Sequence, residues 1–154
     1  MENVGPLIRE LARNEMEALL ARNNVGRLAY AFHDRVDIEP INYVYADGWV
    51  YCRTSVGVKL DTIERHRWVA FEVDEVRGLF DWQSVVVRGA TYVLKADSPQ
   101  DEREAFTPGL TLLNQLLPGT LGGNDPVAFR HVVFRIHLDE VTGREAKPGA
   151  PSSA

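Results

Sequence analysis

Residues 41–52 read Ile-Asn-Tyr-Val-Tyr-Ala-Asp-Gly-Trp-Val-Tyr-Cys, and they indicate the fold class. Aromatic and β-branched residues, which favour strands, stand on both sides of the dipeptide Asp47-Gly48. Asp-Gly between two such runs is a strong signal for a two-residue hairpin turn. The stretch therefore predicts two antiparallel strands joined by a tight turn.

Alternation with a period of two continues on either side of this hairpin. Pro40 interrupts one of the strands, and we expect it at an edge or a bulge where the alternation changes phase. The strands that the alternation predicts cover residues 28–32, 36–45, 49–52, 68–75, 82–94 and 132–138.

Three segments are predicted to form helices. The first runs from about residue 15 to 22 with Asn14 as its cap, and a short second one ends near Arg65. The third begins at Ser98-Pro99 and continues over about 102–117, with a break at Pro108-Gly109. Apolar residues at helical spacing before residue 21 are Leu7, Ile8, Leu11, Met16, Leu19 and Leu20.

Six strands and few helices predict a mainly β protein, a small antiparallel barrel or sandwich with peripheral helices. A parallel nucleotide-binding fold is disfavoured, because crossover helices do not separate the strands and no G-x-G-x-x-G follows a strand. We expect one domain over residues 1–144 and a flexible C-terminal tail over 145–154, where Pro, Gly, Ser and Ala dominate.

The charge and the cysteine content narrow the classes of partner. The 154 residues include 17 Lys and Arg against 22 Asp and Glu, a formal net charge of −5. Without a basic cluster, neither nucleic acid nor an anionic membrane surface is expected as the main partner, and no apolar stretch approaches the roughly 20 residues that span a bilayer. The single Cys52 and the absence of a signal-peptide pattern predict a cytoplasmic protein.

Residues 53–59, Arg-Thr-Ser-Val-Gly-Val-Lys, combine two cations and two hydroxyls where a strand passes into a helix. The first N–H groups of a helix are unpaired and its dipole favours an anion, so this chemistry suits a phosphate monoester. Gly57 would let the backbone approach the phosphate, and Lys59 and Arg53 would supply charge. The alternative is an ordinary polar surface turn with a Ser or Thr cap.

Other reactive residues give weaker signals. The four histidines lack metal-ligand spacing, so His131 and His137 are expected to be solvated or hydrogen-bonded, and no metal site is predicted. Glu72, Asp74 and Glu75 are expected on the solvent side of a strand. Cys52 is expected to be a small buried side chain. No catalytic residue is assigned.

The order of several motifs resembles the pyridoxamine 5'-phosphate oxidase-like flavoproteins, and is most similar to the branch that includes nitroimidazole-resistance proteins. This resemblance implies a six-stranded split β-barrel that binds FMN at the interface of a homodimer. The motifs lie at residues 25–29, 40–44, 49–54, 57–59, 71–74, 84–89 and 141–144.

Carried over by position, the resemblance implies nine cofactor-binding residues. Ser84 stands where relatives place a polar group near the flavin. Trp82 would cover the ring, or else pack in the interface or the core. The phosphate contacts fall on Arg53, Thr54, Ser55 and Lys59, and the strand beside the isoalloxazine ring falls on Asn42, Tyr43 and Val44.

The chain also departs from its relatives. It lacks the C-terminal substrate region of true pyridoxamine phosphate oxidases, and Arg53 replaces a His found in many nitroimidazole-resistance proteins, so neither substrate is expected. Residues 98–125 resemble an insertion whose leucines cover a pocket or a dimer surface. The first hypothesis is an FMN-dependent oxidoreductase. The alternatives are a non-catalytic flavin carrier or sensor, or the same fold with a deazaflavin or haem.

Overall fold

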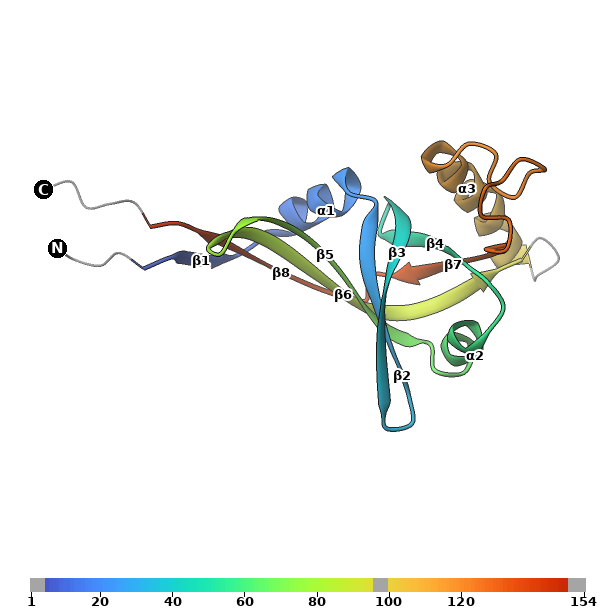
Figure 1. The fold of residues 1–154 in the computed structure, drawn as a ribbon, viewed down its shortest axis with the longest axis horizontal. Coiled ribbons are helices and arrows are strands. Elements are labelled where there is room, and N and C mark those ends of the chain that lie inside the picture. The colour runs from blue at the N-terminus through green and yellow to red at the C-terminus, as the bar shows by residue number, and fades with distance from the viewer. Residues whose placement is uncertain (1–4, 96–99, 150–154) are drawn as a thin grey trace, which may run out of the picture.

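The computed structural model describes residues 5–95 and 100–149, and within them the chain forms eight strands and three helices (Figure 1). Along the chain these elements are β1 (Leu7–Glu10), α1 (Arg13–Arg22), β2 (Val25–Phe32), β3 (Arg35–Ala46), β4 (Trp49–Thr54), α2 (Val58–Arg65), β5 (Trp68–Gly78), β6 (Asp81–Leu94), α3 (Gln100–Leu116), β7 (Val132–His137) and β8 (Glu140–Lys147).

Six of the strands close into an antiparallel barrel, as the sequence predicts. The sheet order is β1-β8-β6-β5-β2-β3-β4-β7, and an additional pairing of β6 with β7 completes the ring. The first part of β6 pairs with β5 and β8, whereas Thr91 to Leu94 pair with β7. Gly89 lies just before this change of partner, where a Cβ would stand 1.7 Å from the carbonyl oxygen of His137. Only glycine allows β7 and β6 to approach so closely.

The hairpin predicted from residues 41–52 is present. Asp47 and Gly48 both have positive φ, 49° and 83°, as a two-residue turn between twisted strands requires. Tyr43 pairs with Cys52 across the hairpin, and both are fully buried. Their alternate positions supply apolar side chains to the barrel interior, which is the main core of the protein.

Two extensions project from the barrel in different directions (Figure 1). One consists of β1, β8 and the β5–β6 hairpin, and the other is the β2–β3 hairpin. Pro40 lies in the second extension, where β3 pairs with β2 but not with β4, so the edge position predicted for it is confirmed. The predicted change of phase is wrong: Val36 and Ile38 keep the outward face and are 73% and 66% exposed.

The two ends of the described chain differ from the sequence prediction. Residues 7–10 form strand β1 instead of a helical turn, because they pair with β8 from Leu7↔Lys147 to Glu10↔Arg144. Residues 145–147 belong to β8 and not to a tail, and Glu145 and Ala146 are buried there. Residues 150–154 of the predicted tail lie outside the described residues.

Helices α1 and α3 also differ from the sequence prediction, in the cap of the first and in the course of the second. Asn14 lies inside the first turn of α1, whose N-terminal amide at Ala12 donates to the Glu15 carboxylate, 3.0 Å away. Helix α3 continues through Pro108 without ending there, and its next residue, Gly109, packs on the Tyr51 ring. The predicted start at Ser98-Pro99 lies outside the described residues. None of the described helices has the length and hydrophobicity needed to span a membrane.

Candidate functional site

The turn between β4 and α2 presents the helix end that the sequence predicts. The cap of α2 is Gly57, which has no side chain to bond the first amides, and within the described part of the chain no side chain bonds them as a cap. A Cβ built at Gly57 would meet no atom within 4 Å, so the space above this backbone is open. Ser55 is half-buried and Thr54 is buried at the end of β4. The helix end is therefore accessible to an anion.

Lys59 stands in the first turn of α2 and is already paired. Its Nζ lies 2.6 Å from the Oε2 of Glu39 on β3, and Glu39 Oε1 also accepts a 2.8 Å hydrogen bond from the Tyr30 hydroxyl. Lys59 lowers the pKa of Glu39, with a smaller contribution from Tyr30 against the effect of burial. Burial and Glu39 together raise the pKa of Tyr30 to about 12. An anion that binds here must therefore compete with Glu39 for the ammonium group of Lys59.

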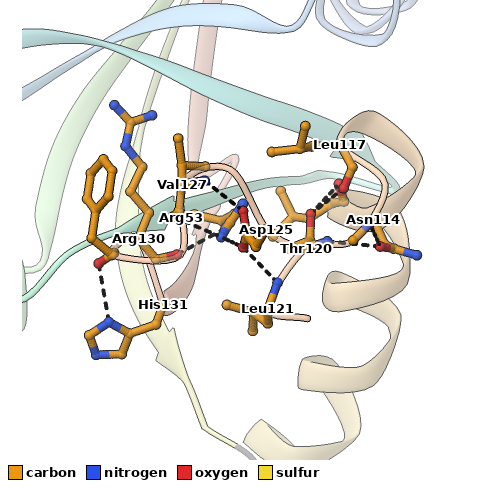
Figure 2. Close-up of polar contacts among 12 residues, drawn as sticks. Arg53, Asn114, Leu117, Thr120, Leu121, Asp125, Val127, Arg130 and His131 are labelled. Carbon is orange, nitrogen blue, oxygen red and sulfur yellow. Dashed lines mark hydrogen bonds and ion pairs between the residues drawn. The ribbon is translucent and has the colours of Figure 1, made fainter. Parts of the chain in front are cut away.

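Arg53 holds the segment that follows α3 (Figure 2). Its Nη2 forms an ion pair with Asp125, and its Nε donates to the carbonyl of Arg130 at 3.0 Å. Asp125 also accepts the backbone N–H groups of Leu121 and Val127, at 2.8 and 3.0 Å. Burial favours a raised pKa for Asp125, but these bonds outweigh it and the pKa is lowered. The guanidinium predicted to bind phosphate therefore has an internal carboxylate partner.

The strand predicted to run beside the flavin ring turns its side chains to both faces. Tyr43 is fully buried, and its hydroxyl donates to the Leu20 carbonyl at 2.7 Å. Burial raises the pKa of this hydroxyl. Asn42 is exposed. Val44 packs against a second, smaller hydrophobic cluster, which consists of Tyr51, Leu94, Ala105, Leu113 and Val133. Of these three side chains, Asn42 is the one that a ligand outside the barrel can reach.

Asn42 and Arg53 meet at a cavity of about 200 Å³ beneath α3. The leucines of the predicted insertion do cover a pocket, since three of them face it. The cavity is lined by Asn42, Arg53, Leu113, Leu116, Leu117, Val127 and Arg130.

Trp82 and Ser84 lie together in a different and larger cavity, of about 700 Å³, between β6, β8 and α1. The Ser84 hydroxyl donates to Glu72 Oε2 at 2.9 Å, and Arg27 Nη1 lies 3.5 Å from the other oxygen of Glu72. Burial, and then the neighbouring Asp74, raise the pKa of Glu72. Glu72 is thus a half-buried, hydrogen-bonded group next to the cavity. It lies on the outer face of β5, as predicted, because its neighbours Phe71 and Val73 point into the core.

The two cavities share no lining residue, so one protomer does not bring the nine predicted residues together. Strands β5 and β2 lie between β6 and β3 in the sheet. The structure instead groups Asn42 with Arg53, Trp82 with Ser84, and Ser55 with Lys59 at the α2 turn.

The remaining candidates have local partners. His137 Nδ1 lies 2.9 Å from Asp139, and His131 Nδ1 lies 3.2 Å from the Phe129 carbonyl, as expected for hydrogen-bonded histidines. Cys52 is fully buried, which raises the pKa of its thiol and confirms its predicted structural role. Over residues 5–95 and 100–149, no group of three or more His, Cys, Asp or Glu side chains is placed to hold a metal ion.

Sequence reasoning did not find Asp125, Arg130 or Glu39. Asp125 is 72 residues from Arg53, and no local pattern marks it as a partner. Glu39 precedes Pro40 in a strand where alternate residues turn inward, a signal that places it on the same face as the buried Ile41.

Comparison with known proteins identifies first the class of fold of this protein and then its family. The closed six-stranded barrel with three helices matches the split-barrel fold of flavin-binding proteins of known structure. Residues 12–145 match the pyridoxamine 5'-phosphate oxidase family, and the chain belongs to that family. The resemblance read from its motifs is confirmed.

Several solved structures are similar to this chain. An FAD-binding protein of Mesorhizobium loti is 30% identical, with a TM-score of 0.70 and coverage of 93% of this chain and 99% of that one. The FAD-binding protein of Mycobacterium smegmatis is 26% identical, with a TM-score of 0.64 and coverage of 90% and 98%. A proposed 5-nitroimidazole antibiotic resistance protein of Bacteroides thetaiotaomicron shares the fold, with a TM-score of 0.68 at 17% identity and coverage of 99% and 97%.

Proposed function

We propose that this protein binds a flavin and uses it as an oxidoreductase acting on a small molecule. The observation that carries the proposal is the accessible N-terminus of α2, where Gly57 leaves the first amides without a side-chain cap and Lys59 adds a positive charge. The similarity to the FAD-binding proteins of Mesorhizobium loti and Mycobacterium smegmatis supports it.

The α2 turn fits the phosphate of the cofactor. Helix amides and the helix dipole stabilise a dianion, and the ammonium of Lys59 and the hydroxyl of Ser55 add donors of the required kind. The open space above Gly57 leaves room for phosphate oxygens against the backbone. Arg53 has its own partner in Asp125, so Lys59 is the principal charge in this proposal.

The ring would lie along the outer face of β3, next to Asn42. Because Trp82 and Ser84 line a separate cavity of the same protomer, we propose a homodimer in which these two residues of one subunit complete the site of the other. Exposed apolar side chains on the β2–β3 hairpin, including Val36 and Ile38, supply surface for such an interface.

FMN is the cofactor predicted from the sequence, and FAD is the alternative favoured by the similar FAD-binding proteins. A bound flavin supplies hydride or electron transfer, while the protein holds its phosphate, orients its ring and excludes water. Ser84, fixed by its hydrogen bond to Glu72, would place a hydroxyl at the ring edge. We assign no catalytic residue of the protein itself. A cytoplasmic location remains part of the proposal.

The absorption spectrum of the purified protein tests the cofactor. Bands of oxidised flavin are expected, and the mass of the molecule released on denaturation distinguishes FMN from FAD. A Soret band, or neither feature after addition of FMN and FAD, would contradict the flavin assignment; a deazaflavin would show its own shorter-wavelength band.

The oxidoreductase part has a separate test. NAD(P)H-dependent reduction of the bound flavin, measured anaerobically, should be faster than reduction of the same free flavin. Tight binding without such reduction, with a range of electron donors, would favour the non-catalytic carrier or sensor instead.

A further inference from the structure

The cavity beneath α3 has an apolar side and a polar side. Leu113, Leu116 and Leu117 of α3 and its following turn form the apolar wall together with Val127. Asn42, Arg53 and Arg130 supply its polar groups. A concave site with an apolar wall and a few convergent polar groups is the usual form of a small-molecule pocket.

The charges around this cavity do not cancel. Arg53 is neutralised by the buried Asp125. Arg130 forms no ion pair with any residue that the structure describes; its guanidinium carbon lies 5.5 Å from the centre of the Phe129 ring. Figure 2 shows its side chain extending away from the Arg53–Asp125 pair. Since none of the described residues that line the cavity is acidic, Arg130 gives this lining a net positive charge.

The backbone around Arg130 is held in place, which fixes the start of this side chain. Its carbonyl accepts the 3.0 Å bond from Arg53 Nε, and its N–H donates to the Val127 carbonyl at 2.9 Å. On the facing strand, the Asn42 amide makes only a 3.3 Å bond to the Asn24 carbonyl. A guanidinium on a backbone that is held in place, with a second donor lining the same cavity, suits a planar carboxylate.

We propose that this cavity binds a small carboxylic acid with an apolar body, its carboxylate on Arg130 and Asn42 and its body against the three leucines. The volume of about 200 Å³ equals roughly seven water molecules at about 30 Å³ each, which limits the ligand to about the size of benzoate.

The substrate role of this acid rests on the proposed function. Asn42 belongs both to the cavity and to the strand beside which the flavin ring is placed, so a carboxylate in the cavity would lie next to the ring. The binding site itself does not depend on the flavin, and the two statements have separate tests.

Benzoate is the probe for the site, and benzamide is its uncharged counterpart. Calorimetric titration of the purified protein should give saturable benzoate binding, with benzamide at least tenfold weaker. Arg130→Gln should weaken benzoate binding at least tenfold, whereas the matched control Arg65→Gln, at an exposed position on α2, should leave it unchanged. Arg130→Lys, which keeps the charge but loses the planar fork, should fall between the wild type and Arg130→Gln.

Equal affinity for benzoate and benzamide, or for the wild type and a folded Arg130→Gln, would overturn the proposal. Tighter binding of inorganic phosphate than of benzoate would also overturn it, since it would show an anion site without a role for the apolar wall. Leu116→Gln tests that wall and should weaken benzoate but not phosphate.

The flavin-loaded protein separates the two proposals. A shift of the flavin absorption bands on adding benzoate, absent in Arg130→Gln, supports the position beside the ring. Benzoate binding without any shift would remove the substrate role and leave the carboxylate site. If no flavin binds but benzoate does, the proposed function fails while the site stands.

Discussion

The guanidinium of Arg53 and the carboxylate of Asp125 form an ion pair that is closed to solvent, with the two side chains 8% and 0% exposed. Through it, β4 holds the chain segment after α3, which also forms the wall of the α3 cavity. Arg53, which the sequence predicted to bind the cofactor, thus shapes the cavity beneath α3.

Removing one charge of this pair should destabilise the protein strongly. Asp125→Asn leaves the Arg53 guanidinium buried without its counter-charge, and the free energy of unfolding in urea should fall by about 3–5 kcal/mol. The exposed pair Arg35–Asp37 provides the control, since Asp37→Asn should cost no more than about 1 kcal/mol. Similar losses for the two variants would show that burial gives the Arg53–Asp125 pair no special weight.

Lys59→Ala should weaken flavin binding by about 1–3 kcal/mol, the range for loss of a charge-assisted hydrogen bond. Fluorescence quenching of the titrated flavin measures the affinity, and Lys95→Ala, an exposed lysine, serves as the control. Unchanged affinity would mean that Lys59 serves only its pair with Glu39.

Glu39→Gln tests the competition for Lys59 from the other side. The amide no longer attracts the ammonium 2.6 Å away, so Lys59 is freed for the phosphate and flavin affinity should rise. The same titration measures it. A clear loss of affinity would instead mean that Glu39 orients Lys59 for binding.

The pair between Arg22 and Glu75 should make stability depend on acid pH. The hydrogen bond from Arg22, with a further one from Asn23 and against the effect of burial, lowers the pKa of Glu75 from 4.5 to about 2. A lowered pKa means that its contribution is complete above about pH 4.5 and is lost as the pH falls towards 2.

Unfolding in urea at pH 6 and at pH 3 measures this contribution. Glu75→Gln should lower the stability by about 1 kcal/mol at pH 6 and by less at pH 3, where the wild type has itself lost part of the interaction. An equal loss at both values would attribute the effect to packing and not to the charge of Glu75.

Neighbouring residues of α3 should respond to alanine in opposite directions. Pro108 is exposed within the helix, and Pro108→Ala restores a backbone donor, so stability should rise by about 1–2 kcal/mol. At Gly109 a Cβ would stand 2.9 Å from the Tyr51 ring, and Gly109→Ala should cost about 1–3 kcal/mol despite its better helix propensity. Thermal unfolding measures both. A gain at both positions would mean that α3 packs less closely on β4 than the structure shows.

The barrel was predictable because its signals are local. The Asp47-Gly48 turn, the aromatic and β-branched run of β4 and the alternation in β5 and β6 each need only a few neighbouring residues. Strand β1 was not predictable in this way, since all four of its residues are exposed and its pairing with β8 alone makes it a strand. Leu7 and Ile8 of β1, together with Leu11 just after it, fit a helical spacing equally well.

In the candidate site, too, the features set by local sequence were predictable and those set by tertiary contacts were not. The α2 turn follows from its own residues, and the structure supplies the uncapped helix end that they predict. The partners Asp125 and Glu39 are set by tertiary contacts, which redirect Arg53 and engage Lys59. The grouping of Trp82 with Ser84 away from Asn42 likewise depends on the closure of the barrel.

The close approach of Gly89 to His137 lies where β6 joins the barrel to one of its two extensions. We call this part of β6 the seam. Strand β6 pairs with β8 in the extension that β1, β8 and the β5–β6 hairpin form, and it closes the barrel by pairing with β7. The change from one partner to the other occurs within a few residues. A methyl group on residue 89 would force β7 away from β6, so the barrel would open next to the extension. Amide protons on both sides of the seam would then exchange with solvent together, as one cooperative unit.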